Sequence, residues 1–167
     1  MSWEAEVIAG LRQQEIDFVA QLPDSILDGL IRDVETAEDF DTVRVAREEE
    51  AVNLLSGVWL GGRKGALICQ SSGLANTFNA LGSHAKPAGL PFLGIVTRRG
   101  DLGDHNRAQV PAGYGLPKLL DAVGIRYNHL DETTDVEKRV GMAAETAFST
   151  QEPYMLLVER TLTGGKE

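Results

Sequence analysis

Hydrophobic and polar positions occur in blocks along the chain, and these blocks predict strands and helices in strict alternation. Stretches rich in aliphatic, β-branched or aromatic residues and bounded by turn residues predict six strands, at 17–23, 42–46, 66–70, 92–96, 125–130 and 154–159. Stretches with apolar residues at three-to-four spacing predict six helices, at 3–14, 25–37, 48–62, 73–85, 116–124 and 135–150. This order indicates an α/β fold: a doubly wound, six-stranded parallel sheet with helices on both faces.

Composition and charge narrow the class of protein. A chain of 167 residues, 43% hydrophobic and 25% charged, is expected to form one domain over residues 1–167. The net charge of -9 disfavours nucleic-acid binding, because phosphate contacts need a basic surface. No apolar run approaches the roughly 20 residues of a membrane span, and the first residues do not resemble a signal peptide. With a single cysteine, Cys69, expected in the core, we predict a cytoplasmic location.

Polar or glycine-rich sequence follows several of the predicted strands. In open parallel sheets, ligands bind beyond the carboxyl ends of the strands. The segments at these exits are LPDS at 22–25, REEE at 47–50, QSSG at 70–73 and TRRGDLGDHNRAQVPAG at 97–113. The last is long for a connection, and long loops are often functional. Any binding site is therefore expected where these four segments meet.

Three of these segments also have an ordinary structural explanation. The carboxylates of Glu48, Glu49 and Glu50 would be stabilised at a helix N-terminus by about 0.3–1 kcal/mol. The serines of QSSG would suit a helix cap, and the backbone there could instead receive an anion or a carbonyl oxygen. Asp24 or Ser25 would begin the helix that follows the first strand. On position alone, the structural explanation is favoured for each.

The 97–113 segment carries the most distinctive charge pattern. Arg98 and Arg99 form an adjacent cationic pair, and guanidinium groups suit carboxylate, sulfonate or phosphonate groups because they donate two parallel hydrogen bonds. A solvated loop explains the pair equally well. His105 could titrate near neutrality. The three histidines, with His84 and His129, show no spacing typical of metal ligands, so no metal site is predicted in this chain.

Taken together, the segments resemble the pyrimidine-binding domain of thiamin diphosphate-dependent 2-oxo acid decarboxylases, which is flavodoxin-like. The matching motifs occur in order and cover most of the chain: LPDSIL (22–27), VAREEEAVNLLSG (45–57), QSSGLANTFNAL (70–81), TRRGDLGDHNRAQVPAG (97–113) and LLDAVGIRY (119–127). The resemblance is closest to the branch that acts on 3-sulfopyruvate, with the branch that acts on phosphonopyruvate next.

The resemblance implies a role for Glu48. The family pattern A-x-E-x-x-A matches Ala46 to Ala51 and places the catalytic glutamate at Glu48. Its carboxylate would hydrogen-bond N1′ of the cofactor's aminopyrimidine, which favours the tautomer that accepts the C2 proton. The resemblance also implies that four consecutive residues line the cofactor pocket: Ser71, Ser72, Gly73 and Leu74.

The substrate residues are implied in the same way. Ser25 matches the polar residue that the family places over the reaction centre, and Asp24 precedes it. Arg99 and Gln109 fall in the segment peculiar to the sulfonate and phosphonate branch, where an anionic tail would need a cation. His105 is a candidate proton donor or an ordinary loop residue, and the sequence leaves both open.

The resemblance further implies that this chain supplies half of an active site. The family holds Mg²⁺ and the diphosphate with a G-D-G motif in a second domain, whereas Gly103-Asp104-His105 carries histidine where the motif needs glycine. That domain and Mg²⁺ are therefore expected on a separate beta subunit, in an α2β2 complex or a multiple of it. Phosphonopyruvate, another small acidic 2-oxo acid or a carboligation remain alternatives to sulfopyruvate decarboxylation. A noncatalytic binding or regulatory module is the alternative of another class.

Overall fold

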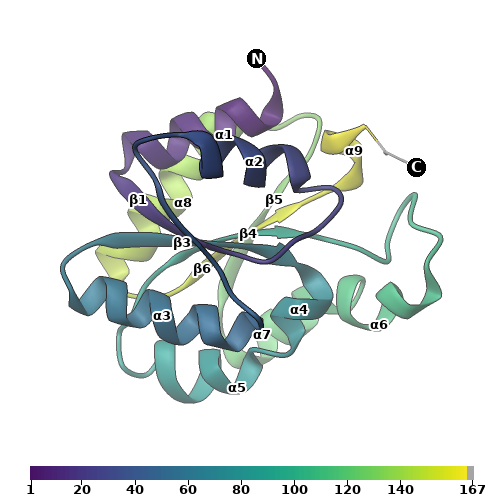
Figure 1. Ribbon diagram of the computed structural model, residues 1–167. Coiled ribbons are helices and arrows are strands. Elements are labelled where there is room, and N and C mark those ends of the chain that lie inside the picture. Colours follow the sequence, from purple (N-terminus) through teal and green to yellow (C-terminus); the bar gives the residue numbers. More distant parts are fainter. Residues whose placement is uncertain (165–167) are drawn as a thin grey trace.

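The computed structural model describes residues 1–164 and contains one sheet. Its strands are β1 Ile16–Gln21, β2 Asp41–Arg44, β3 Lys64–Gln70, β4 Leu93–Thr97, β5 Arg126–Leu130 and β6 Tyr154–Val158. All neighbouring strands pair in parallel, in the order β2-β1-β3-β4-β6-β5 (Figure 1). The predicted six-stranded parallel sheet is confirmed. The last three residues of the predicted domain lie outside the described residues.

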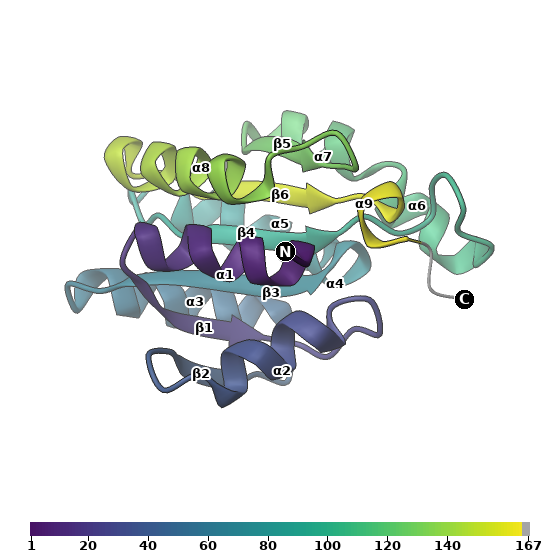
Figure 2. The same cartoon turned by 90° about the horizontal axis from the view of Figure 1, so that it is seen from above.

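Helices cover both faces of the sheet, as predicted (Figure 2). One layer consists of α1 Trp3–Gln13, α2 Asp28–Thr36 and α8 Val136–Thr150. The other consists of α3 Glu48–Leu60, the short α4 Ser71–Ala75 and α5 Phe78–Ala80, and α7 Leu116–Val123. The short helices α6 Val110–Gly113 and α9 Arg160–Thr163 lie beyond the ends of the strands. Within residues 1–164, no helix has the length and apolar character needed to cross a membrane.

The core is divided between the two faces by the alternation of side chains along each strand. On β3, Ala66 and Ile68 belong to the cluster under α1, α2 and α8, whereas Leu67 and Cys69 belong to the cluster under α3 and α7. Cys69 is fully buried, which confirms its predicted place in the core. This two-faced burial explains why β3 and β4 read as continuous apolar runs.

Two predicted helices differ from the observed ones in detail. The stretch 73–85 is not one helix but α4, α5 and a π-helical turn over Leu81–Ala85. The buried Thr77 hydroxyl donates a hydrogen bond of 2.7 Å to the Leu74 carbonyl, an interaction that competes with helix continuation. The helix expected from residue 25 begins at Asp28, because the Asp24 carboxylate accepts backbone N–H bonds that hold residues 25–27 in a turn.

Candidate active site

The predicted site segments meet at the carboxyl edge of the sheet, where the parallel strands end. The exits of β1, β2, β3 and β4 supply Asp24, Glu48, Ser71 and Arg99 respectively. Burial raises the pKa of the Cys69 thiol, one residue before the end of β3, and the negative charges of Glu48 and Asp24 raise it further. Both carboxylates therefore lie close to the end of β3, one approaching from α3 and the other from the turn before α2.

Glu48 lies at the first position of α3, with its carboxylate against Gly73 of α4. A Cβ atom built on Gly73 would lie 1.7 Å from Oε1 of Glu48 and 2.2 Å from its Cδ. The carboxylate can occupy this place only because residue 73 has no side chain. The position of the Glu48 carboxylate thus requires a glycine at residue 73 of QSSG, for steric reasons.

The three consecutive glutamates differ in their contacts. The Glu50 carboxylate accepts a 3.0 Å hydrogen bond from the Ala46 N–H, and Glu49 pairs with Arg47 at 3.3 Å. Within residues 1–164, no group donates a hydrogen bond to the Glu48 carboxylate, which is half-buried. Glu48 is therefore the member of the run that is available to a ligand.

Ser71 does not cap a helix, so the capping explanation for it is wrong. Its side chain is fully buried, and its Oγ accepts a hydrogen bond of 3.2 Å from the backbone N–H of Arg99. The bond joins the start of α4 to the exit of β4. Of the other predicted cofactor residues, Ser72 is half-buried and Leu74 is buried with Gly73.

Arg99 is held between two acids. Its Nη1 lies 3.2 Å from Oδ2 of Asp24, and its Nε lies 2.9 Å from Oδ2 of Asp104. Both aspartate side chains are 3% exposed, and that of Arg99 is 16% exposed. Asp24 also accepts bonds from the Ile26 and Leu27 N–H groups, so it links the exits of β1 and β4.

Burial by itself would raise the pKa of Asp104, but hydrogen bonds outweigh it. The N–H groups of Asn106 and Gly100 and the Arg99 guanidinium all donate to this carboxylate, and they lower its pKa well below the usual range. The carboxylate is therefore ionised throughout the neutral range. It also fixes the backbone of the loop that carries His105.

Asp104→Asn should destabilise the chain in a pH-dependent way. Because the folded-state pKa lies below the unfolded value of about 3.9, the carboxylate stabilises the fold above that value. This contribution is lost as pH falls through the folded-state pKa. Urea unfolding of both proteins at several pH values should show a gap in unfolding free energy that is constant near pH 7 and shrinks below about pH 4. A gap that stays unchanged at pH 3 would contradict this account of Asp104.

The adjacent side chains of Arg98 and Arg99 contact different groups of residues. Arg98 donates to both oxygens of Glu159, at 3.0 and 3.2 Å, and also pairs with Asp101. Nδ1 of His129, on β5, lies 2.6 Å from the same Glu159 carboxylate. Arg98 thus holds the loop to the ends of β5 and β6, whereas Arg99 faces the candidate site.

A cavity of about 570 Å³ opens beside Arg99. The lining residues are Ser25, Ile26, Arg99, Asp104, His105, Asn106 and Arg160. It brings together three predicted residues, Ser25, Arg99 and His105. Gln109 does not line it: the Gln109 backbone packs on Gly100, and its Oε1 is buried without a hydrogen-bond partner. Arg160 was not among the predicted site residues, although its position directly after the last predicted strand was a usable signal.

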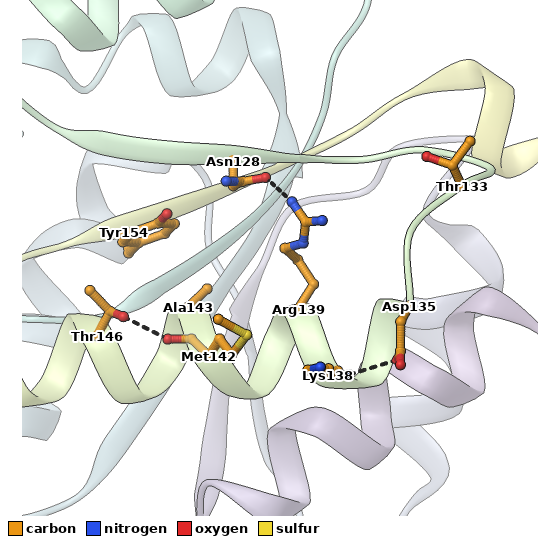
Figure 3. A pocket seen from close by; sticks show the side chains of 9 residues that line it. All are labelled: Asn128, Thr133, Asp135, Lys138, Arg139, Met142, Ala143, Thr146 and Tyr154. Atoms are coloured by element: carbon orange, nitrogen blue, oxygen red, sulfur yellow. Dashed lines mark hydrogen bonds between the residues drawn. The ribbon is translucent and has the colours of Figure 1, made fainter.

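A second cavity, of about 480 Å³, lies away from these residues, between α8 and strands β5 and β6 (Figure 3). Arg139 reaches from α8 to the Asn128 side chain on β5 there, while Lys138 and Thr146 take part in bonds within the α8 segment. None of the predicted site residues lines this cavity.

Among residues 1–164, no group of three or more histidine, cysteine, aspartate or glutamate side chains is placed to hold a metal ion.

Comparison with curated proteins identifies relatives over nearly the whole chain. The sulfopyruvate decarboxylase subunit alpha of Methanococcus maripaludis is 33% identical over 159 residues, which cover 95% of each chain. The sulfopyruvate decarboxylase of Methanosarcina acetivorans is 32% identical over 93% of this chain, but over only 39% of its own length. The phosphonopyruvate decarboxylase of Streptomyces hygroscopicus is 37% identical, with coverages of 92% and 39%. No protein-family model matches the sequence.

A solved structure supports the fold. The 2-oxoglutarate:ferredoxin oxidoreductase of Magnetococcus marinus, determined with 2-oxoglutarate, coenzyme A and succinyl-CoA bound, superposes with a TM-score of 0.76. The match covers 98% of this chain and 29% of that chain, at 17% sequence identity. At this identity the comparison establishes a shared fold.

Proposed function

Because the chain belongs to the family of sulfopyruvate decarboxylase alpha subunits, we propose that it forms half of a thiamin diphosphate-dependent decarboxylase. The reaction is conversion of 3-sulfopyruvate to sulfoacetaldehyde and CO₂. The observation that carries the proposal is the half-buried Glu48 carboxylate, which lies over Gly73 with no hydrogen-bond donor from the described residues.

Glu48 would hold the aminopyrimidine of the cofactor. A carboxylate can accept a charge-assisted hydrogen bond from a protonated ring nitrogen, and such a bond strengthens when it is withdrawn from water. Gly73, by lacking a side chain, leaves room for the carboxylate, and Ser71 fixes α4 to the exit of β4. When bound, the cofactor supplies the electron sink for the loss of CO₂.

We assign the diphosphate and Mg²⁺ to a partner beta subunit, in an α2β2 complex or a multiple of it. The relatives support a second component in two ways. Several are named as alpha subunits. Single-chain relatives match this chain over only 39% of their length, so their remaining sequence has no counterpart in it.

The substrate would lie between Glu48 and the cavity beside Arg99. Ser25 and His105 line that cavity, so a 2-oxo acid bound there would lie beside both, with His105 as a candidate proton donor. Arg99 would contribute positive charge near the anionic tail. Gln109, the last residue of the 3-10 helix Arg107–Gln109, would support the same loop.

The test is CO₂ release by this chain co-expressed with its beta subunit, with thiamin diphosphate and Mg²⁺. We expect turnover of 3-sulfopyruvate. Relatives named phosphonopyruvate decarboxylases are 33% and 37% identical over 92% of this chain, so phosphonopyruvate is assayed in parallel. Turnover of that acid alone would make phosphonopyruvate the substrate in place of 3-sulfopyruvate. An assembled complex that releases CO₂ from neither acid would contradict the proposal, and a chain that never associates would favour a binding module.

A further inference from the structure

Exposed apolar side chains gather in the segment that follows β4. Among residues 1–164, four exposed large ones lie between positions 102 and 119, namely Leu102, Val110, Tyr114 and Leu119. Val110 and Tyr114 are one helical turn apart, since the Tyr114 N–H donates a 3.0 Å hydrogen bond to the Val110 carbonyl. Pro111, which follows Val110, is also exposed. Adjacent exposed apolar residues of this kind are typical of contact surfaces, and we call Val110, Pro111 and Tyr114 the α6 patch.

The α6 patch lies beside the candidate active site. The helix α6 is in contact with α4 at the carboxyl edge of the sheet (Figure 1). Gly73 belongs to α4, and the Glu48 carboxylate lies against this glycine. The patch is therefore one helix away from the half-buried carboxylate that has no hydrogen-bond donor within residues 1–164.

Close backbone packing fixes α6 on the exit of β4. A Cβ atom built on Gly113 would lie 1.5 Å from the Arg99 carbonyl oxygen, and one built on Gly100 would lie 2.3 Å from that of Gln109. Glycine at both positions lets the two backbone segments lie directly on each other. The patch is thus held in one place before any partner binds, which lowers the entropic cost of association.

Two exposed cations flank the patch along the chain. Arg107 begins the 3-10 helix that precedes α6, and Lys118 lies in α7, four residues after Tyr114. Within residues 1–164 neither cation makes an ion pair, whereas acids of the preceding loop are already paired with arginines. In a chain with a net charge of -9, two such cations beside an apolar surface favour a partner with acidic side chains.

We propose that the α6 patch is a docking surface for the beta subunit, which contacts it with apolar side chains and places acidic side chains opposite Arg107 and Lys118. The inference rests on the proposed function and adds the surface through which the site is completed. Single-chain relatives match this chain over only 39% of their length, so this fold occurs there together with further sequence. A second copy docked patch to patch would instead bring the same cations of both chains together, and like charges repel.

The test is the stability of the complex purified from co-expression of the two subunits, diluted stepwise and followed by sedimentation velocity. Tyr114→Glu and Val110→Glu each place a charge in the patch, and each should raise the dissociation constant about tenfold or more. Leu60→Glu is the matched control, because Leu60 is 76% exposed and ends α3, whereas Glu48 begins it. This control adds the same charge at the opposite edge of the sheet and should leave the dissociation constant within about twofold of wild type.

Arg107→Glu tests the predicted acidic chemistry of the partner. This reversal of charge should raise the dissociation constant several-fold in buffer of low ionic strength and much less at high ionic strength, because salt screens exposed charges. An unchanged dissociation constant at low ionic strength would contradict acidic groups opposite Arg107.

The possible outcomes separate this inference from the proposed function. A Tyr114→Glu complex that releases CO₂ and dissociates no more readily than the Leu60→Glu complex would overturn the inference alone. A Tyr114→Glu substitution that separates two copies of this chain, each still bound to its beta subunit, would make a second copy the occupant. A wild-type chain that neither binds the beta subunit nor releases CO₂ with it would overturn the proposed function as well. Should Tyr114→Glu melt below Leu60→Glu, Arg107→Glu decides, since the Arg107 side chain is exposed.

Discussion

Glu48→Gln is expected to lower kcat of the assembled complex by about 10²–10⁴-fold, the usual contribution of a positioned acid or base. Glutamine has nearly the same shape as glutamate, but it carries no charge and cannot stabilise a protonated ring nitrogen. The loss should appear in kcat rather than in stability, because no group among residues 1–164 donates a hydrogen bond to this carboxylate. Steady-state CO₂ release and thermal melting of the same preparation measure both effects.

The neighbouring glutamate provides a matched control for this experiment. Glu49→Gln removes one carboxylate from the same helix turn and breaks the pair with Arg47, a half-exposed contact worth at most about 1 kcal/mol. Its kcat should stay within a factor of two or so of wild type, since an exposed pair has little effect on chemistry elsewhere. Equal losses in the two variants would show a general effect of charge at the helix terminus, and retained activity in Glu48→Gln would remove the proposed role.

Gly73→Ala should also abolish most activity, through the position of Glu48. The added methyl group would lie 1.7 Å from the Glu48 Oε1 atom, so the carboxylate must move away. Displacement of a catalytic group by about 1 Å can cost about 10²-fold in rate. The fold should survive, because the colliding atoms belong to the end of a side chain that can rotate.

Gly57→Ala is the control for this substitution. Gly57 lies on the exposed side of α3, and an added Cβ there would have no atom within 4 Å. It should leave kcat unchanged and raise stability by up to about 1 kcal/mol, since alanine is the better helix former. If Gly73→Ala were as active as Gly57→Ala, the close contact between Glu48 and Gly73 would have no part in catalysis.

The sheet could be predicted because each strand carries its own signal. The strands β3 and β4 are buried on both faces, so the sequence shows short, continuous apolar stretches there. The break within 73–85 carries no such signal. At this break the Thr77 hydroxyl bonds a carbonyl three residues back instead of facing solvent, a contact that the sequence does not reveal.

The site could be predicted only as far as strand exits define it. Consecutive residues beyond a strand point to opposite sides, so the strand pattern alone could not tell which of Arg98 and Arg99 faces the cavity. Only the family resemblance singled out Arg99, which does line it. The place of Arg160 in the cavity lining depends on the strand order. Because β6 lies between β4 and β5 in the sheet, the residues after β6 come beside the 97–113 loop. The order of the strands along the sequence does not reveal that β6 lies between β4 and β5. The pairing of Arg99 with Asp24, 75 positions away, is likewise a property of the folded chain.

The central claim is that Glu48 acts on the cofactor within a site completed by the beta subunit. The most direct measurement is the rate at which the C2 proton of thiamin diphosphate exchanges for deuterium from the solvent in the assembled complex, followed by acid quenching and proton NMR. The wild-type complex should exchange this proton much faster than free cofactor in the same buffer, and Glu48→Gln should return the rate close to that of free cofactor. Equally fast exchange in the wild-type and Glu48→Gln complexes, both shown to bind the cofactor, would contradict the account.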